Sequence, residues 1–140
     1  LVQLTVEDDQ GTTDSCEAFV RVMDVTPPAI QQVSTSMSQI WPPNHKMVPV
    51  TISVLSVDNC VPASCRITSV RSNEPVSGLG DGDTTPDWQI LTSSTVNLRA
   101  ERSGRGNGRV YTISVECMDR AGNTSTGDTT VSVPHSQTGK

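Results

Sequence analysis

The feature that most constrains this chain is an internal repeat. Residues 1–22 read LVQLTVEDDQGTTDSCEAFVRV, and residues 112–133 read TISVECMDRAGNTSTGDTTVSV. An offset of 111 residues places Gly122 on Gly11 and Asp119 on Asp8. On both sides of the shared turn, apolar residues alternate with polar ones. Each copy therefore has the form strand, Asp-x-x-Gly turn, strand, which predicts two β-hairpins of the same kind.

Composition excludes an all-helical fold for the rest of the chain. It contains 18 Val, 17 Thr and 17 Ser but only 6 Leu, with 10 Gly and 9 Pro. β-branched residues favour strands, and Gly and Pro mark turns. Short alternating segments at 30–37, 46–57, 65–70, 88–91 and 96–100 predict further strands. Together with the last hairpin they predict an all-β, Ig-like antiparallel β-sandwich of about seven strands, preceded by an extra N-terminal β-hairpin.

One predicted strand contains an irregularity. Between residues 46 and 57 the alternating positions Val48, Val50, Ile52 and Val54 give way to Leu55 and Val57, which have the other phase. A change of phase within a strand indicates a β-bulge there.

The repeat also predicts the domain boundaries. Because the hairpin at 112–133 ends a module, we interpret the hairpin at 1–22 as the end of a preceding one. Two prolines at 27 and 28 mark the boundary, since they block both a helix and a β-ladder. We expect residues 1–24 to be the terminal hairpin of a preceding Ig-like module, 25–134 to be a complete module, and 135–140 to be a tail. The chain starts with Leu rather than Met, which indicates a piece of a longer product.

Charge and cysteine content limit the partners and the compartment. The net charge is −5, and no run of Lys and Arg forms a basic stripe, so we expect no nucleic-acid binding. No apolar run reaches the roughly 20 residues of a membrane helix, so we expect no membrane insertion. Four cysteines in an acidic, Ser- and Thr-rich chain favour disulfides and an extracellular location.

The pairing of the cysteines has several solutions. Cys60, Cys65 and Cys117 are expected at one pole of the sandwich, and we favour Cys65–Cys117, with Cys60–Cys65 as the alternative. Cys16 would be left unpaired in an ordinary tandem array. Alternatively, the first hairpin adds strands to the sheet of another copy of the chain, and Cys16–Cys60 locks the joint. Repeated head to tail, this contact would build a fibre.

An acidic loop is the candidate metal site. Asp81, Asp83 and Asp87 lie between glycines and a predicted strand, and their carboxylates could wrap a calcium ion, which prefers six to eight oxygen ligands. The loop does not fit the EF-hand pattern, and a solvated acidic turn is the other interpretation.

The two aligned turns have their own predicted residues. Asp8 and Asp119 are expected to accept hydrogen bonds from the backbone of their own turns, with Gly11 and Gly122 supplying the turn conformation. Asn123 completes the second turn.

Four motifs carry a family resemblance. They are DVTPP at 24–28, WPPNHK at 41–46, VDNC at 57–60 and CMDRAGN at 117–123. They resemble bacterial extracellular Ig-like modules of the hyalin-repeat and PKD-like groups, which occur in tandem. The resemblance implies an Ig-like fold, a spacer, adhesive or stalk role, and no catalytic residues. It also implies a cysteine early in the last strand. Cys16 matches that position in the first hairpin, but Gly127 occupies it in the second.

The predicted function is therefore that of a non-catalytic extracellular structural or adhesive module of a secreted or surface bacterial protein. Its expected partners are neighbouring Ig-like modules or other copies of the chain, and it could assemble head to tail through its N-terminal hairpin. The chain has no G-x-S-x-G, H-E-x-x-H, Walker or dinucleotide motif, so we expect no enzyme. The alternative is a carbohydrate-binding accessory module of a secreted hydrolase, with a glycan stacked on Trp41 or Trp88.

Overall fold

The computed structural model describes residues 1–76 and 84–136, and this part of the chain contains strands and no helix. Accordingly, it offers no helix that could span a membrane. The strands are β1 (Val2–Glu7), β2 (Thr13–Ala18), β3 (Ala29–Thr35), β4 (Met47–Val57), β5 (Ser64–Ser72), β6 (Trp88–Ile90), β7 (Thr95–Arg99), β8 (Gly108–Met118) and β9 (Thr124–Pro134).

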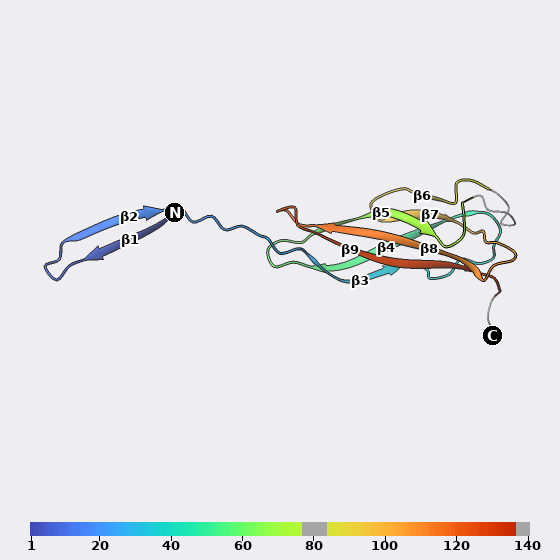
Figure 1. Cartoon of the computed structure of the whole chain (residues 1–140), viewed down its shortest axis with the longest axis horizontal. Coiled ribbons are helices and arrows are strands. Elements are labelled where there is room, and N and C mark those ends of the chain that lie inside the picture. The colour runs from blue at the N-terminus through green and yellow to red at the C-terminus, as the bar shows by residue number, and fades with distance from the viewer. Residues whose placement is uncertain (77–83, 137–140) are drawn as a thin grey trace.

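Three antiparallel sheets make up the fold. β1 and β2 form a hairpin that pairs with no other strand, the four-stranded sheet has the order β3-β4-β7-β6, and the three-stranded sheet has the order β5-β8-β9. The two larger sheets lie against each other, and an extended segment joins them to the hairpin (Figure 1). The prediction of an all-β fold with seven strands after an extra hairpin is confirmed.

The segment that follows β3 leaves its own sheet and joins the other one. Gln39 forms an isolated parallel bridge with Ser132 of β9. The amide of Ile40 donates to the Ser132 carbonyl at 2.8 Å, and the amide of Ser132 donates to the Ser38 carbonyl at 3.0 Å. The beginning and the end of the sandwich therefore run side by side in the same direction.

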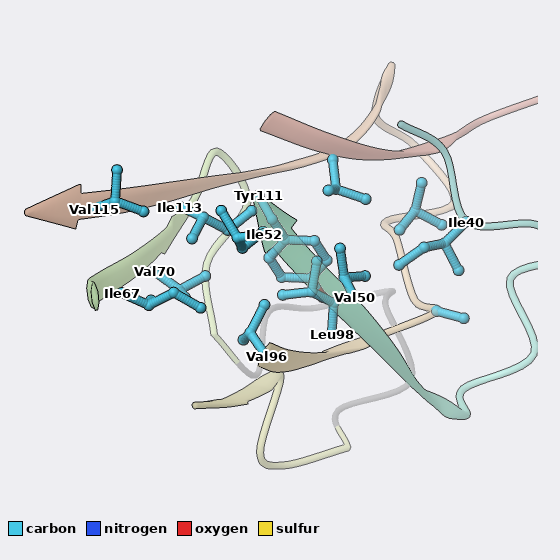
Figure 2. Close-up of a cluster of buried hydrophobic side chains, with 13 residues drawn as sticks. Ile40, Val50, Ile52, Ile67, Val70, Val96, Leu98, Tyr111, Ile113 and Val115 are labelled. Atoms are coloured by element: carbon cyan, nitrogen blue, oxygen red, sulfur yellow. The ribbon is translucent and has the colours of Figure 1, made fainter. Parts of the chain in front are cut away.

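Alternating side chains of the two sheets form the core. Strand β8 shows the pattern most clearly, because Tyr111, Ile113 and Val115 are each at most 1% exposed while the residues between them are half-buried. Figure 2 shows the Tyr111 ring next to the side chains of Val50 and Leu98 of the opposing sheet. The buried hydrophobic residues of the core are Ile40, Val50, Ile52, Ile67, Val70, Val96, Leu98, Ala100, Tyr111, Ile113, Val115, Val131 and Val133.

The predicted bulge in strand β4 is wrong. Val50 and Ile52 point into the core and Val54 follows in the same phase, whereas Leu55 and Val57 are 54% and 47% exposed. Strand β4 thus keeps one phase to its end and presents two apolar residues to solvent. The register shift lies in its partner β3, between Ile30 and Gln32. A second shift, between Ile67 and Ser69 of β5, was not predicted.

A disulfide joins Cys65 to Cys117. The two residues are directly paired across β5 and β8, which are neighbours in the three-stranded sheet. Of the two pairings considered for Cys65, the structure therefore contains the favoured one.

The WPPNHK motif forms a loop that is tied to the end of β7. His45 adopts φ 62°, a left-handed conformation that is uncommon for a residue other than glycine. Its amide donates to the Ala100 carbonyl at 2.9 Å, and its carbonyl accepts from Nη1 of Arg99 at 2.8 Å. Its ring Nδ1 lies 2.8 Å from Oε2 of Glu101, whose side chain is 1% exposed. These contacts compensate the backbone strain and fix the loop on the sandwich.

A buried ion pair lies at the same end of the sandwich as the WPPNHK loop. The Arg109 side chain is fully buried, and its Nη1 lies 2.6 Å from Oδ2 of Asp87, whose side chain is 1% exposed. Nη1 also donates to the Tyr111 hydroxyl at 3.3 Å, and that hydroxyl donates to the Arg99 carbonyl at 2.9 Å. Nε of Arg109 contacts Oε2 of Glu74 at 3.3 Å. Burial opposes the charge of Arg109, but its contacts with Tyr111 and Asp87 outweigh this effect and raise its pKa, so the guanidinium stays charged.

We expect Arg109→Met to lower the free energy of unfolding by about 3–5 kcal/mol, because it leaves the buried Asp87 carboxylate without its cation. Chemical denaturation in urea at neutral pH measures this difference. Arg66→Met is the matched control. Arg66 pairs with Glu116 at 2.9 Å, but its side chain is 63% exposed, so its loss should cost less than about 1 kcal/mol. Equal effects of the two substitutions would contradict the importance given to the buried pair.

Candidate functional site

Three carboxylates gather where the linker enters the sandwich. Asp24 belongs to the linker, Asp58 follows β4, and Asp119 follows β8. One oxygen of each lies within 4.8 Å of the others. We call these three residues the aspartate trio. It is the arrangement in the described part of the chain that could hold a metal ion, and its oxygen ligands are of the kind that calcium prefers.

Asp119 is held in place by its own turn. Its Oδ1 accepts from the Asn123 amide at 2.9 Å, and its Oδ2 accepts from the Asn123 side chain at 2.7 Å. Burial alone would raise the pKa of Asp119, but these hydrogen bonds and those from the turn amides outweigh burial and lower it. Because its pKa is lowered on folding, this carboxylate stabilises the fold at any pH above the pKa of an Asp in the unfolded chain. The contribution is lost as the pH falls through the lowered pKa.

The same asparagine holds the linker. Nδ2 of Asn123 also donates to the Asp24 carbonyl at 3.2 Å. The Asp24 side chain in turn accepts from the Thr26 amide at 3.0 Å, and Pro28, a few residues further on, is buried. The turn between β8 and β9 therefore binds the linker that leads into the sandwich.

Asp58 organises the loop that carries Cys60. Its Oδ1 accepts from the amides of Cys60 and Val61 at 3.0 and 3.3 Å. Its Oδ2 is buried and has no hydrogen-bond partner. A hydrogen bond to Asp24 raises the pKa of the Cys60 thiol, and desolvation and the negative charges of the trio raise it further. The thiol therefore stays protonated at neutral pH.

Of the three predicted calcium ligands, Asp87 belongs to the described part of the chain. Asp81 and Asp83 lie outside the described residues. Asp87 is 2% exposed and its Oδ2 is bound by Arg109. That oxygen already has a cation beside it, so Asp87 serves the buried ion pair.

The remaining predicted residues lie in the two aligned turns, on β2 and in the loop between β4 and β5. Asp8 Oδ1 accepts from the amides of Gln10 and Thr12 at 2.9 and 2.8 Å, and Gly11 has φ +79°. The equivalent Gly122 has φ +92°. Cys16 on β2 and Cys60 in the loop between β4 and β5 are both exposed and not in a disulfide.

The two tryptophans have different surroundings. Trp88 packs against the core and makes an edge-on contact with Tyr111, with the ring centroids 6.3 Å apart. It also lines a hollow of about 310 Å³ together with Val76, Thr85, Pro86 and Asp87. Trp41 is 43% exposed.

Sequence reasoning found Asp119 as a turn residue but missed the aspartate trio. Asp58 stood within a recognised motif, VDNC, and Asp24 within another, DVTPP. What the sequence did not show is that the linker, the end of β4 and the end of β8 meet in space.

Comparisons of the chain with protein-family models, with curated proteins and with solved structures found no match.

We expect Asp58→Asn to raise the melting temperature in metal-free buffer by about 2–4 °C, because it removes one of three neighbouring negative charges and keeps the acceptor for the loop amides. Asp14→Asn, on the exposed hairpin, is the control and should change nothing. Thermal unfolding is then repeated with calcium. Calcium held by the trio would stabilise the wild type more than Asp58→Asn, and an equal response of the two would show that the trio does not hold it.

We also expect iodoacetamide to alkylate Cys60 more slowly than Cys16 at pH 8, because the thiolate is the reacting species and the trio disfavours it. Asp24→Asn should accelerate the modification of Cys60 about two- to tenfold and leave that of Cys16 unchanged. Peptide mass spectrometry measures both sites in one sample. A rate at Cys60 that does not respond to Asp24→Asn would contradict the assigned interaction.

Proposed function

We propose that this chain is a non-catalytic structural module of a secreted or surface protein, in which Ig-like modules follow one another along the polypeptide. One observation carries the proposal. The hairpins β1–β2 and β8–β9 are paired in the same register, since the offset of 111 residues converts the pair Leu4↔Cys16 into the observed pair Val115↔Gly127. A chain that forms the same hairpin twice, once inside a sandwich, is what a tandem array would contain.

The order of the strands supports an Ig-like module. Sheets ordered β3-β4-β7-β6 and β5-β8-β9 follow the arrangement A-B-E-D and C-F-G of constant-type Ig sandwiches. Tyr111, on the strand in the F position, bonds back to the Arg99 carbonyl, which is similar to the tyrosine corner of such domains. The disulfide differs, because it joins two strands of one sheet rather than the two sheets.

The disulfide fits an extracellular role. Structural disulfides persist in oxidising compartments. In Cys65–Cys117, Cys117 is 0% exposed and Cys65 is half-buried. A spacer or adhesive module acts by holding its shape, and here one pole is held by a disulfide and the other by a buried ion pair. The motif resemblance to bacterial tandem modules points the same way, with neighbouring modules or other copies of the chain as partners.

A carbohydrate-binding module is the second candidate. The exposure of Trp41 and the hollow beside Trp88 favour it, because sugars stack on exposed aromatic faces. However, the Trp88 ring is engaged with Tyr111, which leaves Trp41 as the better exposed of the two rings.

A glycan array probed with the oxidised full chain separates the two functions. The structural proposal expects no saturable binding. It also expects that reducing the disulfide lowers the free energy of unfolding by roughly 2–4 kcal/mol. Saturable binding that is lost in Trp41→Ala and kept in Leu91→Ala, another exposed apolar position, would overturn the structural proposal in favour of glycan binding.

A further inference from the structure

Within the described residues, the hairpin β1–β2 carries an apolar face that is exposed to solvent. Val2, Leu4 and Val6 share one face of β1 and are 54%, 60% and 61% exposed. Across the hairpin, Leu4 pairs with Cys16 and Val2 with Ala18, so the apolar face continues onto β2. An isolated two-stranded hairpin is marginally stable in water, and this face needs a partner.

The structure itself contains the same face in its covered state. Val2 and Leu4 are equivalent to Ile113 and Val115 of β8, which are 0% and 1% exposed. Val20 is equivalent to Val131 of β9, which is 0% exposed. The two turns also agree, because the side chains of Asp8 and Asp119 each accept from the amide four residues further on. The two hairpins therefore present one surface in two environments.

In β8–β9 this surface packs into the core, together with inward side chains of the opposing sheet such as Val50 and Leu98. Strand β5 pairs alongside β8, and β3 lies across from β9. At Gly127, the position equivalent to Cys16, an added Cβ would lie 3.1 Å from Val33 and 3.5 Å from Ile30 of β3. The side chain at this position thus faces the first strand of the sandwich.

We infer that the partner of the hairpin's apolar face is a set of strands equivalent to β3–β7, belonging to an Ig-like module placed before it in the same polypeptide. Cys16 then faces the first strand of that module, as Gly127 faces β3. The inference rests on the proposed tandem architecture and names its partner. A second copy of this chain is the poorer occupant, because its own β8–β9 hairpin already fills the matching place.

A chimera tests the inference directly. Residues 112–133 of the full chain are replaced by the sequence of residues 1–22, with Gly retained at position 127. The parent for comparison is Cys65→Ala with Cys117→Val, because the graft brings Val6 to position 117. We expect the chimera to unfold cooperatively, with the core amides of β5 protected as in the parent. A second graft, shifted by one residue, turns the apolar face outward and should not fold. Failure of the in-register graft, or equal behaviour of both grafts, would overturn the inference.

Hydrogen exchange on the unaltered chain is the second measurement. Because the face is uncovered here, the β1–β2 amides should exchange at least about tenfold faster than the equivalent β8–β9 amides at every protein concentration. Protection that grows with concentration would assign the face to a second copy. Protection that is independent of concentration would assign it to the chain's own sandwich. Either result overturns the inference while leaving the structural role untouched, whereas glycan binding would overturn that role without affecting the chimera.

Discussion

The buried ion pair between Arg109 and Asp87 is the interaction on which one end of the sandwich depends. A guanidinium that is fully out of water must have its donors satisfied in place, or its burial costs several kcal/mol. Arg109 meets this demand with groups from separate segments: the Asp87 carboxylate before β6, and the Glu74 carboxylate and the Pro75 carbonyl after β5. These contacts hold the segment before β6 and the segment after β5 close to the Arg109 guanidinium. The core between the sheets contains few aromatic residues. The ion pair therefore helps to fix how the two sheets pack against each other.

Period-two alternation was sufficient to predict most strands, because one face of each packs on the core and the other meets solvent. It worked best for β8, where the inward residues are apolar and several of the outward ones are polar. It failed at the end of β4, where Leu55 and Val57 are apolar and exposed. The alternating pattern does not distinguish an exposed valine from a buried one. The change of apolar phase at Leu55 therefore predicted a bulge in β4, which is the wrong strand. The irregularity belongs to β3, and it is defined only by the pairing of two strands.

Of the candidate site, the sequence predicted the turn role of Asp119, which acts locally. It also predicted the disulfide. Cys65 and Cys117 had the right phase on strands expected to be neighbours, and the structure pairs them. The aspartate trio could not be predicted, because its members come from three loops that meet only when both sheets have formed. Asp87 was interpreted from its neighbours in sequence as a possible metal ligand. Its actual neighbour, Arg109, is distant in sequence, and a buried arginine has no local signature.

The parallel bridge between Gln39 and Ser132 has a mechanical consequence. The first and last segments of the sandwich run side by side in the same direction, and the chain enters the sandwich at one end and leaves it at the other (Figure 1). Tension along the polypeptide pulls these two segments in opposite directions, so their hydrogen bonds are loaded together in shear instead of being opened one after another. The Cys65–Cys117 bond provides a covalent shortcut across β5 and β8. The chain between these two cysteines therefore lies outside the path of the load and carries no tension even after the sheets separate.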